Sequence, residues 1–292
     1  MTTLHTFGCS ITQGFALPDT INPVLDDQGR PLDSSQVQDM IERKIVKWED
    51  IHLYKPSDYA WPAVLADRLG IAVKNYARRG ACFQQISRQC AVAARDIQPD
   101  DIVIVMWTYL SRLSVQWPAR TTVPFCNIVD PFCGWQTKIL PGFNKFFGLS
   151  AAPKNTSVTD DRIHQYIQDS AKYTYLNPLG IYNQYYNNLV LQQMTAGFLN
   201  ATGARVIHLS VEHELPLRQL EKARQNLDDS LRSPYVIPHP DQWYTVSVDH
   251  TSCLVIHDTS IPPAENDMHP SVQHHSNFAL HIYKRYFQNH IQ

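Results

Sequence analysis

The stretch DDIVIVMWT, residues 100–108, carries an apolar run that is rich in β-branched side chains. Such a run is typical of a central strand in a parallel sheet, because helices cover both faces of that strand. Two earlier stretches also have the pattern of strands, Thr3–Phe7 and IAVKNYA at 71–77. A fourth, ARVIHLSV at 204–211, follows later in the chain.

The segments between these strands have the pattern of helices. Residues 59–69 follow a capping Ser57 or Asp58 and end before Gly70, a common stop signal. Residues 83–98 carry apolar side chains at spacings of three and four and end before Pro99. Further helices are expected at 182–201, 215–231 and 272–289. The alternation predicts a three-layer α/β/α sandwich with right-handed crossovers around a parallel sheet of about five strands.

Length and composition limit the domain count and the partners. The chain has 292 residues, 43% of them hydrophobic, which is enough for one sizeable core. We expect a single domain over residues 1–292, with insertions at about 16–56 and 113–178, where the alternating pattern weakens. A formal charge of −2 and an isoelectric point near 6.7 imply no broad basic face, so neither nucleic acid nor a membrane is an expected partner.

Location and redox state follow from what the sequence lacks. It has no pattern of a secretory signal and no apolar stretch long enough for a membrane helix, so the expected location is the cytoplasm. The six cysteines are scattered and lack the spacing of zinc or redox sites. We therefore expect reduced, mostly structural thiols and no metal.

The stretch FGCSITQG, residues 7–14, places Ser10 directly after the first strand. A turn from a strand into a helix exposes a serine hydroxyl and nearby backbone N–H groups, which suits a nucleophile. Thr12 stands where the G-x-S-x-G elbow has its second glycine, and no Gly-Lys pair follows for a phosphate-binding loop. A helix N-cap is the structural alternative for Ser10. Cys9 is expected to be a buried thiol, with a role as nucleophile as its alternative.

A candidate base for Ser10 lies at the other end of the chain, in ENDMHPS at 265–271. His269 follows Asp267 by two residues, and that carboxylate is close enough in sequence to hold the imidazole Nδ1–H and leave Nε2 for a serine. Capping of the last helix is the structural alternative for His269. His274, His275 and His281 follow, but adjacent histidines do not share a helix face with the others, so we expect a solvated face and no metal site.

Together these blocks resemble the SGNH hydrolases, an esterase and lipase superfamily named for Ser, Gly, Asn and His in four blocks. FGCSITQG is similar to the first block, and NYARRG at 75–80 is similar to the second, which makes Gly80 an oxyanion donor by resemblance. DMHPS is similar to the fourth block and gives Asp267 and His269. The family's third-block Asn is absent from VMWTYLSR at 105–112. Thr108 is its simplest substitute.

The fourth block also departs from the family pattern. It has Asp-x-His where many members have Asp-x-x-His, and the acidic position of the longer spacing would fall on Asn266, which is the alternative to Asp267. The shorter spacing resembles the alginate O-acetyltransferase-like branch. Trp107 and Tyr109 are alternative oxyanion donors and, with Arg112, candidate substrate-binding residues at the edge of the sheet. Arg112 is equally compatible with a structural role, and the aromatic residues of 117–186 fit either a core or a sugar-binding groove.

The resemblance implies a flavodoxin-like SGNH hydrolase fold and a serine esterase that needs no cofactor. Ser10 would form an acyl-enzyme, His269 would move the proton, Asp267 would orient His269, and the N–H groups of Ser10 and Gly80, with Thr108, would hold the oxyanion. The expected substrate is an O-acetyl or other short acyl group on a carbohydrate or small ester. The alternatives are an O-acyltransferase with the same triad and a non-catalytic carbohydrate-binding or structural module.

Overall fold

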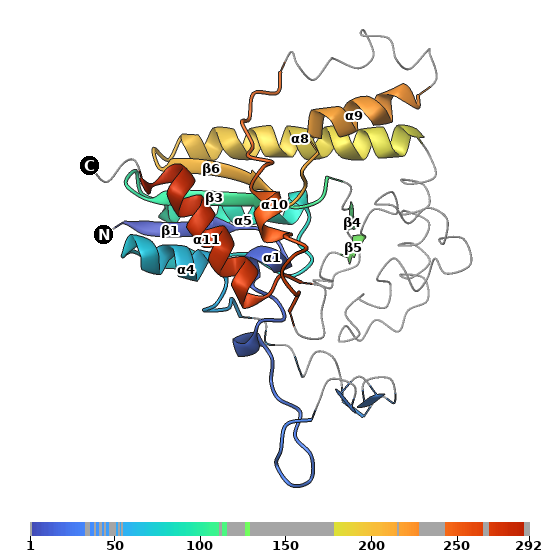
Figure 1. The fold of residues 1–292 in the computed structure, drawn as a ribbon. Coiled ribbons are helices and arrows are strands. Elements are labelled where there is room, and N and C mark those ends of the chain that lie inside the picture. Colours follow the sequence, from blue (N-terminus) through green and yellow to red (C-terminus); the bar gives the residue numbers. More distant parts are fainter. Residues whose placement is uncertain are drawn as a thin grey trace.

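Four parallel strands form the sheet at the centre of the protein (Figure 1). They lie in the order β2-β1-β3-β6 and have the bounds Ala72–Asn75, Thr3–Phe7, Ile102–Trp107 and Arg205–Ser210. The computed structural model describes residues 2–32, 55–110, 178–214, 216–227, 243–264 and 269–288, some positions between 36 and 53, and the backbone of 113–115 and 126–128. The predicted α/β fold with a parallel sheet is confirmed.

Strand β3 is the buried centre of this sheet. It pairs with β1 on one side and with β6 on the other, with Val105 opposite Phe7 and His208. The side chains of Val103 to Trp107 are at most 1% exposed. This burial explains the continuous apolar run of the sequence, because a strand covered on both faces has no side chain to present to water.

A fifth strand position is reduced to a single bridge in the described part of the chain. Asp249 pairs in parallel with Leu209, where its N–H donates to the His208 carbonyl at 2.9 Å. The Asp249 carboxylate then accepts the N–H of Thr251 at 2.9 Å. That side-chain hydrogen bond to the backbone two residues later turns the chain out of the extended form, so the bridge does not grow into a strand.

Helices cover both faces of the sheet (Figure 1). Helix α11 packs against α4 on one side, and α5 packs against α8 on the other, with α9 on the outside of α8. Their bounds are Val272–Tyr286 for α11, Trp61–Leu69 for α4, Phe83–Ala93 for α5, Pro178–Asn200 for α8 and Pro216–Gln225 for α9. Short helices α1 (Ser10–Gln13), η1 (Pro18–Thr20), η2 (Ala94–Asp96) and α10 (Cys253–Ile256) complete this part.

The predicted helices are present. Some of their ends differ from the predicted ones, because local hydrogen bonds set where a helix stops. Gly70 ends α4 in the left-handed conformation at φ 67°, as the stop signal predicts. The predicted helix over 83–98 ends at Ala93 instead and tightens into η2. The N–H of Gln98 donates to the Asp101 carboxylate at 2.8 Å, so the chain has already left the helix when it reaches Pro99.

The predicted solvated face at His274 and His275 is wrong. The two side chains are 4% and 0% exposed. His274 donates its Nε2–H to the carbonyl of Asp258 at 2.9 Å, and His275 accepts the N–H of Trp61 at 3.2 Å through Nδ1. Each imidazole has a polar partner on another element, and this partner permits its burial. The residues next to His274 and His275 in the sequence do not reveal these partners.

Most of the predicted insertion over 113–178 lies outside the described residues, and so do the aromatic residues 117–177. Its described backbone consists of β4 (Leu113–Val115) and β5 (Cys126–Ile128), which pair antiparallel. In the part of the chain that the structure describes, no helix combines the length and the apolar character needed to cross a membrane.

Candidate active site

Two residues from opposite ends of the chain meet at the carboxyl edge of the sheet. The Nε2 atom of His269 lies 2.9 Å from the Oγ atom of Ser10, across 259 residues of sequence. Ser10 begins α1 directly after β1, and His269 lies three residues before α11. The site adjoins β1 and β3, where the strand order reverses, which is the position at which open α/β sheets bind ligands.

The local sequence around Ser10 forces a tight turn. A Cβ atom at Gly8 would lie 2.2 Å from the Oγ1 atom of Thr12, so only glycine lets the chain fold back this closely. Gly14 ends α1 in the left-handed conformation at φ 76°. The N–H of Phe15 then donates to the Ser10 carbonyl at 3.0 Å, which closes the turn.

Hydrogen bonds to α1 hold the second predicted block against the first. The carboxamide of Asn75 donates to the Thr12 carbonyl at 2.8 Å. The N–H of Arg79 donates to Oε1 of Gln13 at 2.7 Å, and Gln13 is only 4% exposed. Gly80 follows Arg79 with φ 72°, a conformation that favours glycine. The loop from Asn75 to Gly80 is therefore fixed beside the turn that carries Ser10.

Two backbone donors at this edge are not used elsewhere. In the described part of the chain, neither the N–H of Ser10 nor that of Gly80 has a hydrogen-bond acceptor. The hydroxyl of Thr108, which follows β3, is 1% exposed and also has no partner. A buried hydroxyl without a partner costs free energy, so its retention in the core favours a functional use.

Trp107 lies in the core and does not join this group. Its indole is 1% exposed, its N–H donates to Nδ1 of His208 at 3.1 Å, and it stacks on Phe83 with ring centroids 4.9 Å apart. The indole N–H already has an acceptor and the ring is buried, so Trp107 is neither a spare oxyanion donor nor an exposed ring. Tyr109 is half-buried and packs against the same core.

Phe15 contacts His269 and Arg79 stacks on Phe15, and neither residue was predicted from the sequence. The Phe15 ring meets the imidazole edge-on, with centroids 5.1 Å apart and planes at 66°. The Arg79 guanidinium carbon lies 4.4 Å from the centroid of the same ring. The available signal was adjacency, because Phe15 directly follows Gly14 and Arg79 directly precedes Gly80.

The backbone around Phe15 and His269 supports this contact. Ala16 has φ 66°, a left-handed conformation that is uncommon for a residue with a side chain. Phe15 and Ala16 pack with Ala264, whose N–H donates to the His269 carbonyl at 2.8 Å. The segment that ends at His269 is thus tied to the turn that begins at Ser10.

Several predicted site residues lie outside the described part of the chain. Asp267 and its alternative Asn266 are among them, and so is Arg112. Cys9, beside Ser10, is a free and buried thiol, as are Cys90 and Cys253. Among the described residues, no group of three or more His, Cys, Asp or Glu side chains is arranged to hold a metal ion.

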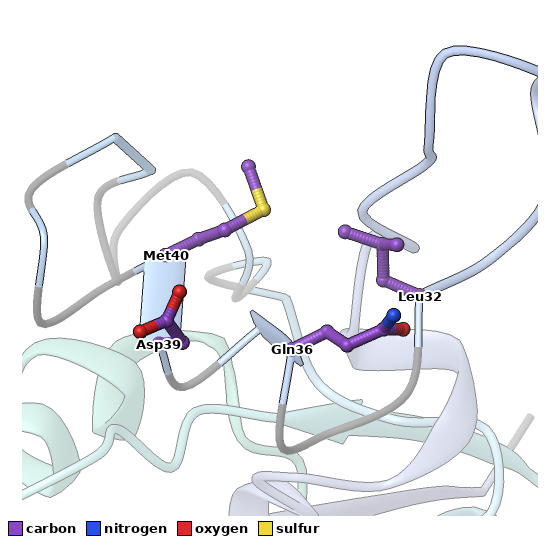
Figure 2. Close-up of a pocket in the computed structure, with 4 residues that line it drawn as sticks. All are labelled: Leu32, Gln36, Asp39 and Met40. Carbon is purple, nitrogen blue, oxygen red and sulfur yellow. The ribbon is translucent and has the colours of Figure 1, made fainter.

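A separate hollow of about 470 Å³ lies on the segment between residues 32 and 40 (Figure 2). Leu32, Gln36, Asp39 and Met40 line it. Gln36 and Asp39 are exposed to solvent, so the hollow is open. None of its lining residues contacts Ser10 or His269 through a described interaction, and we assign it no role in the candidate active site.

Comparisons with known proteins give a distant structural likeness at low sequence identity. No protein-family model matches the sequence, and a search of curated proteins finds no match. Among solved structures, the chain is similar to an acetyl xylan esterase from the rumen bacterium Butyrivibrio proteoclasticus, with a TM-score of 0.42 and 12% identity. The likeness covers 97% of this chain and 63% of that chain, so this chain spans less than two thirds of the esterase's length.

Proposed function

We propose that the protein is a serine ester hydrolase of the SGNH type. It removes an O-acetyl or another short acyl group from a carbohydrate or a small ester by way of an acyl-enzyme. The observation that carries this proposal is the 2.9 Å distance between His269 Nε2 and Ser10 Oγ. A nucleophile and its base need this hydrogen-bonding distance, and the two residues are those that the sequence motifs single out.

In the proposed reaction, His269 accepts the Ser10 proton as Oγ attacks the ester carbonyl. The resulting imidazolium gives that proton to the leaving alcohol, and an acyl group remains on Ser10. A water molecule then loses a proton to His269, attacks the acyl carbonyl, and releases the acid and the free serine. Asp267 is proposed to hold the Nδ1–H of His269 and so to fix its tautomer.

The negative charge that develops on the carbonyl oxygen needs hydrogen-bond donors. The N–H groups of Ser10 and Gly80 are proposed for this role, and their lack of described acceptors supports it. The unpartnered hydroxyl of Thr108 is proposed as the third donor, in place of the Asn that the family has in its third block. Loss of one such donor costs on the order of 10²–10³ in turnover.

The proposal is tested by labelling with a fluorophosphonate probe and by hydrolysis of p-nitrophenyl acetate. The Ser10→Ala variant should lose labelling and lose at least about 10⁴-fold in turnover, because the nucleophile is removed. Ser87→Ala is the matched control, since Ser87 is also a buried serine but lies on α5. Labelling of Ser10→Ala at another residue, or turnover equal to that of the wild type, would contradict the proposal.

The same material separates hydrolysis from the two alternatives. Release of acetate in the absence of an added alcohol supports a hydrolase and argues against a strict acyltransferase. Binding of a glycan without labelling and without turnover would instead indicate a binding module on the same fold.

A further inference from the structure

The short segment that carries Thr108 is anchored on both sides. Before it, the carbonyl of Trp107 accepts the N–H of Val211 at 2.9 Å, which carries the pairing of β3 with β6 one residue further. After it, both backbone groups of Leu110 are bound by side chains, although this residue lies in no helix or strand. Only Thr108 and Tyr109 lie between these two anchors, so their path is set from both ends.

The side chains that bind Leu110 come from elements far along the chain. The carboxylate of Glu212, just after β6, accepts the Leu110 N–H at 3.0 Å. The carboxamide of Asn188, in the middle of α8, donates to the Leu110 carbonyl at 2.5 Å. Leu110 is 0% exposed and Asn188 is 1% exposed. Loss of the Asn188 donor would therefore leave a buried carbonyl unpaired, which proteins rarely tolerate.

Glu212 is itself held in place by several hydrogen bonds. Its Oε2 atom accepts the carboxamide of Gln219, on α9, at 3.1 Å. Its N–H donates to the Ser210 hydroxyl at 3.0 Å, and its carbonyl accepts the Nδ1–H of His250 at 3.0 Å. A carboxylate that is fixed in this way is a rigid support for the backbone it binds.

The anchored segment adjoins the turn that carries Ser10. A Cβ atom at Gly8 would lie 3.1 Å from the Met106 carbonyl, and the Thr12 hydroxyl donates to Sδ of Met106 at 3.4 Å. Thr108 follows Met106 by two residues. The χ1 angle of a β-branched side chain is stiff and depends on the backbone, so the backbone of Thr108 sets where its hydroxyl points.

We infer that Asn188 and Glu212 are positioning residues of the proposed active site, which hold the backbone of Leu110 and so aim the Thr108 hydroxyl at the oxyanion. The inference rests on the proposed hydrolase function and explains how Thr108 is oriented for it. Neither side chain is proposed to touch the substrate. An oxyanion donor must lie at hydrogen-bonding distance, and a displacement of about 1 Å costs on the order of 10² in rate.

A double-mutant cycle separates positioning from general stabilisation. Asn188→Leu keeps the branched shape of the side chain and removes its donor, so kcat should fall about ten- to hundredfold while KM stays within about twofold. In a Thr108→Val protein the same change should lower kcat by less than about twofold further, because no hydroxyl is left to aim. Equal falls in the two backgrounds would overturn the inference, since Asn188 would then act independently of Thr108.

Asn187→Leu is the matched control, because Asn187 is the same residue type one position earlier and its side chain is exposed. Its kcat should stay within about twofold of the wild-type value. A fall in Asn187→Leu as large as that in Asn188→Leu would overturn the inference, because the effect would then belong to α8 as a whole.

Glu212 gives a second test, which also serves if Asn188→Leu does not fold. Glu212→Gln keeps an oxygen that is able to accept the Leu110 N–H, whereas Glu212→Ala does not. The kcat of Glu212→Gln should therefore exceed that of Glu212→Ala by about tenfold, the effect of one hydrogen bond. Equal kcat values in these two variants would exclude Glu212 as a positioning residue.

A measurement by NMR separates the failure of this inference from the failure of the proposed function. The Thr108 methyl signal, assigned with Thr108→Val, reports the χ1 rotamer through its chemical shift and its three-bond couplings to the backbone. The wild type and Asn187→Leu should show one rotamer, and Asn188→Leu should show a different or averaged one. If the rotamer changes but no ester is hydrolysed, the positioning stands and the hydrolase proposal falls. An unchanged shift and unchanged couplings in Asn188→Leu overturn the inference, with or without activity.

Discussion

Replacing His275 by Asn should make the folded protein less sensitive to acid. His275 is fully buried on α11, and its Nδ1 accepts the N–H of Trp61 at the start of α4. Its Nε2 has no hydrogen-bond partner. Burial, with His274 and His269 nearby in addition, lowers the pKa of His275 from the ordinary 6.5 to about 3. The folded state therefore resists protonation of this ring, whereas the unfolded chain does not.

The sign and size of the effect follow from this difference in pKa. The contribution of His275 to stability is fully present above pH 6.5 and is lost as the pH falls from 6.5 towards 3, because the unfolded state binds the proton first. One pH unit in that window costs about 1.4 kcal/mol, so lowering the pH from 8 to 5 costs about 2 kcal/mol. His208, whose pKa burial lowers to about 4, adds a loss of about the same size.

The assay is urea unfolding followed by circular dichroism at about pH 8 and about pH 5. The difference in unfolding free energy between the two pH values should be about 2 kcal/mol smaller in His275→Asn than in the wild type. Asn keeps an acceptor near the place of Nδ1 but does not titrate. The loss of ring volume lowers stability at both pH values, so the pH difference is the quantity to compare. An unchanged pH difference would refute the reasoning.

Three further changes test the candidate active site. Phe15→Leu should lower kcat by about tenfold while KM stays within about twofold, because the ring positions His269. A raised KM with an unchanged kcat would contradict this. Gly8→Ala should lower the unfolding free energy by about 2 kcal/mol, measured in urea, since the new Cβ would lie 2.2 Å from Thr12 Oγ1; a wild-type midpoint would count against the tight turn. Thr108→Val should lower kcat by about 100- to 1,000-fold without lowering stability, because it removes a hydroxyl that has no described partner; unchanged turnover would exclude Thr108 as a donor.

Elements whose signals are local were predictable from the residues. The run IVIVMW lies in β3, and the stop at Gly70 ends α4, because strand burial and helix termination leave a pattern within a few residues. Ser10 was singled out for the same reason, as a serine in a strand-to-helix turn between two glycines. The burial of His274 and His275 was missed, since the polar partners that permit it come from α4 and from the segment before α11.

The contacts that build the site depend on segments far apart in the sequence. Ser10 and His269 are 259 residues apart and meet because β1 ends, and α11 begins, at the same edge of the sheet. The stacking of Arg79 on Phe15, and of Phe15 against His269, left no periodic signal in any one segment. Backbone preference and hydrophobic periodicity act over a few residues, whereas side-chain packing acts between the surfaces that the topology brings together. The helices and strands were therefore predictable from the sequence, and the contacts between them were not.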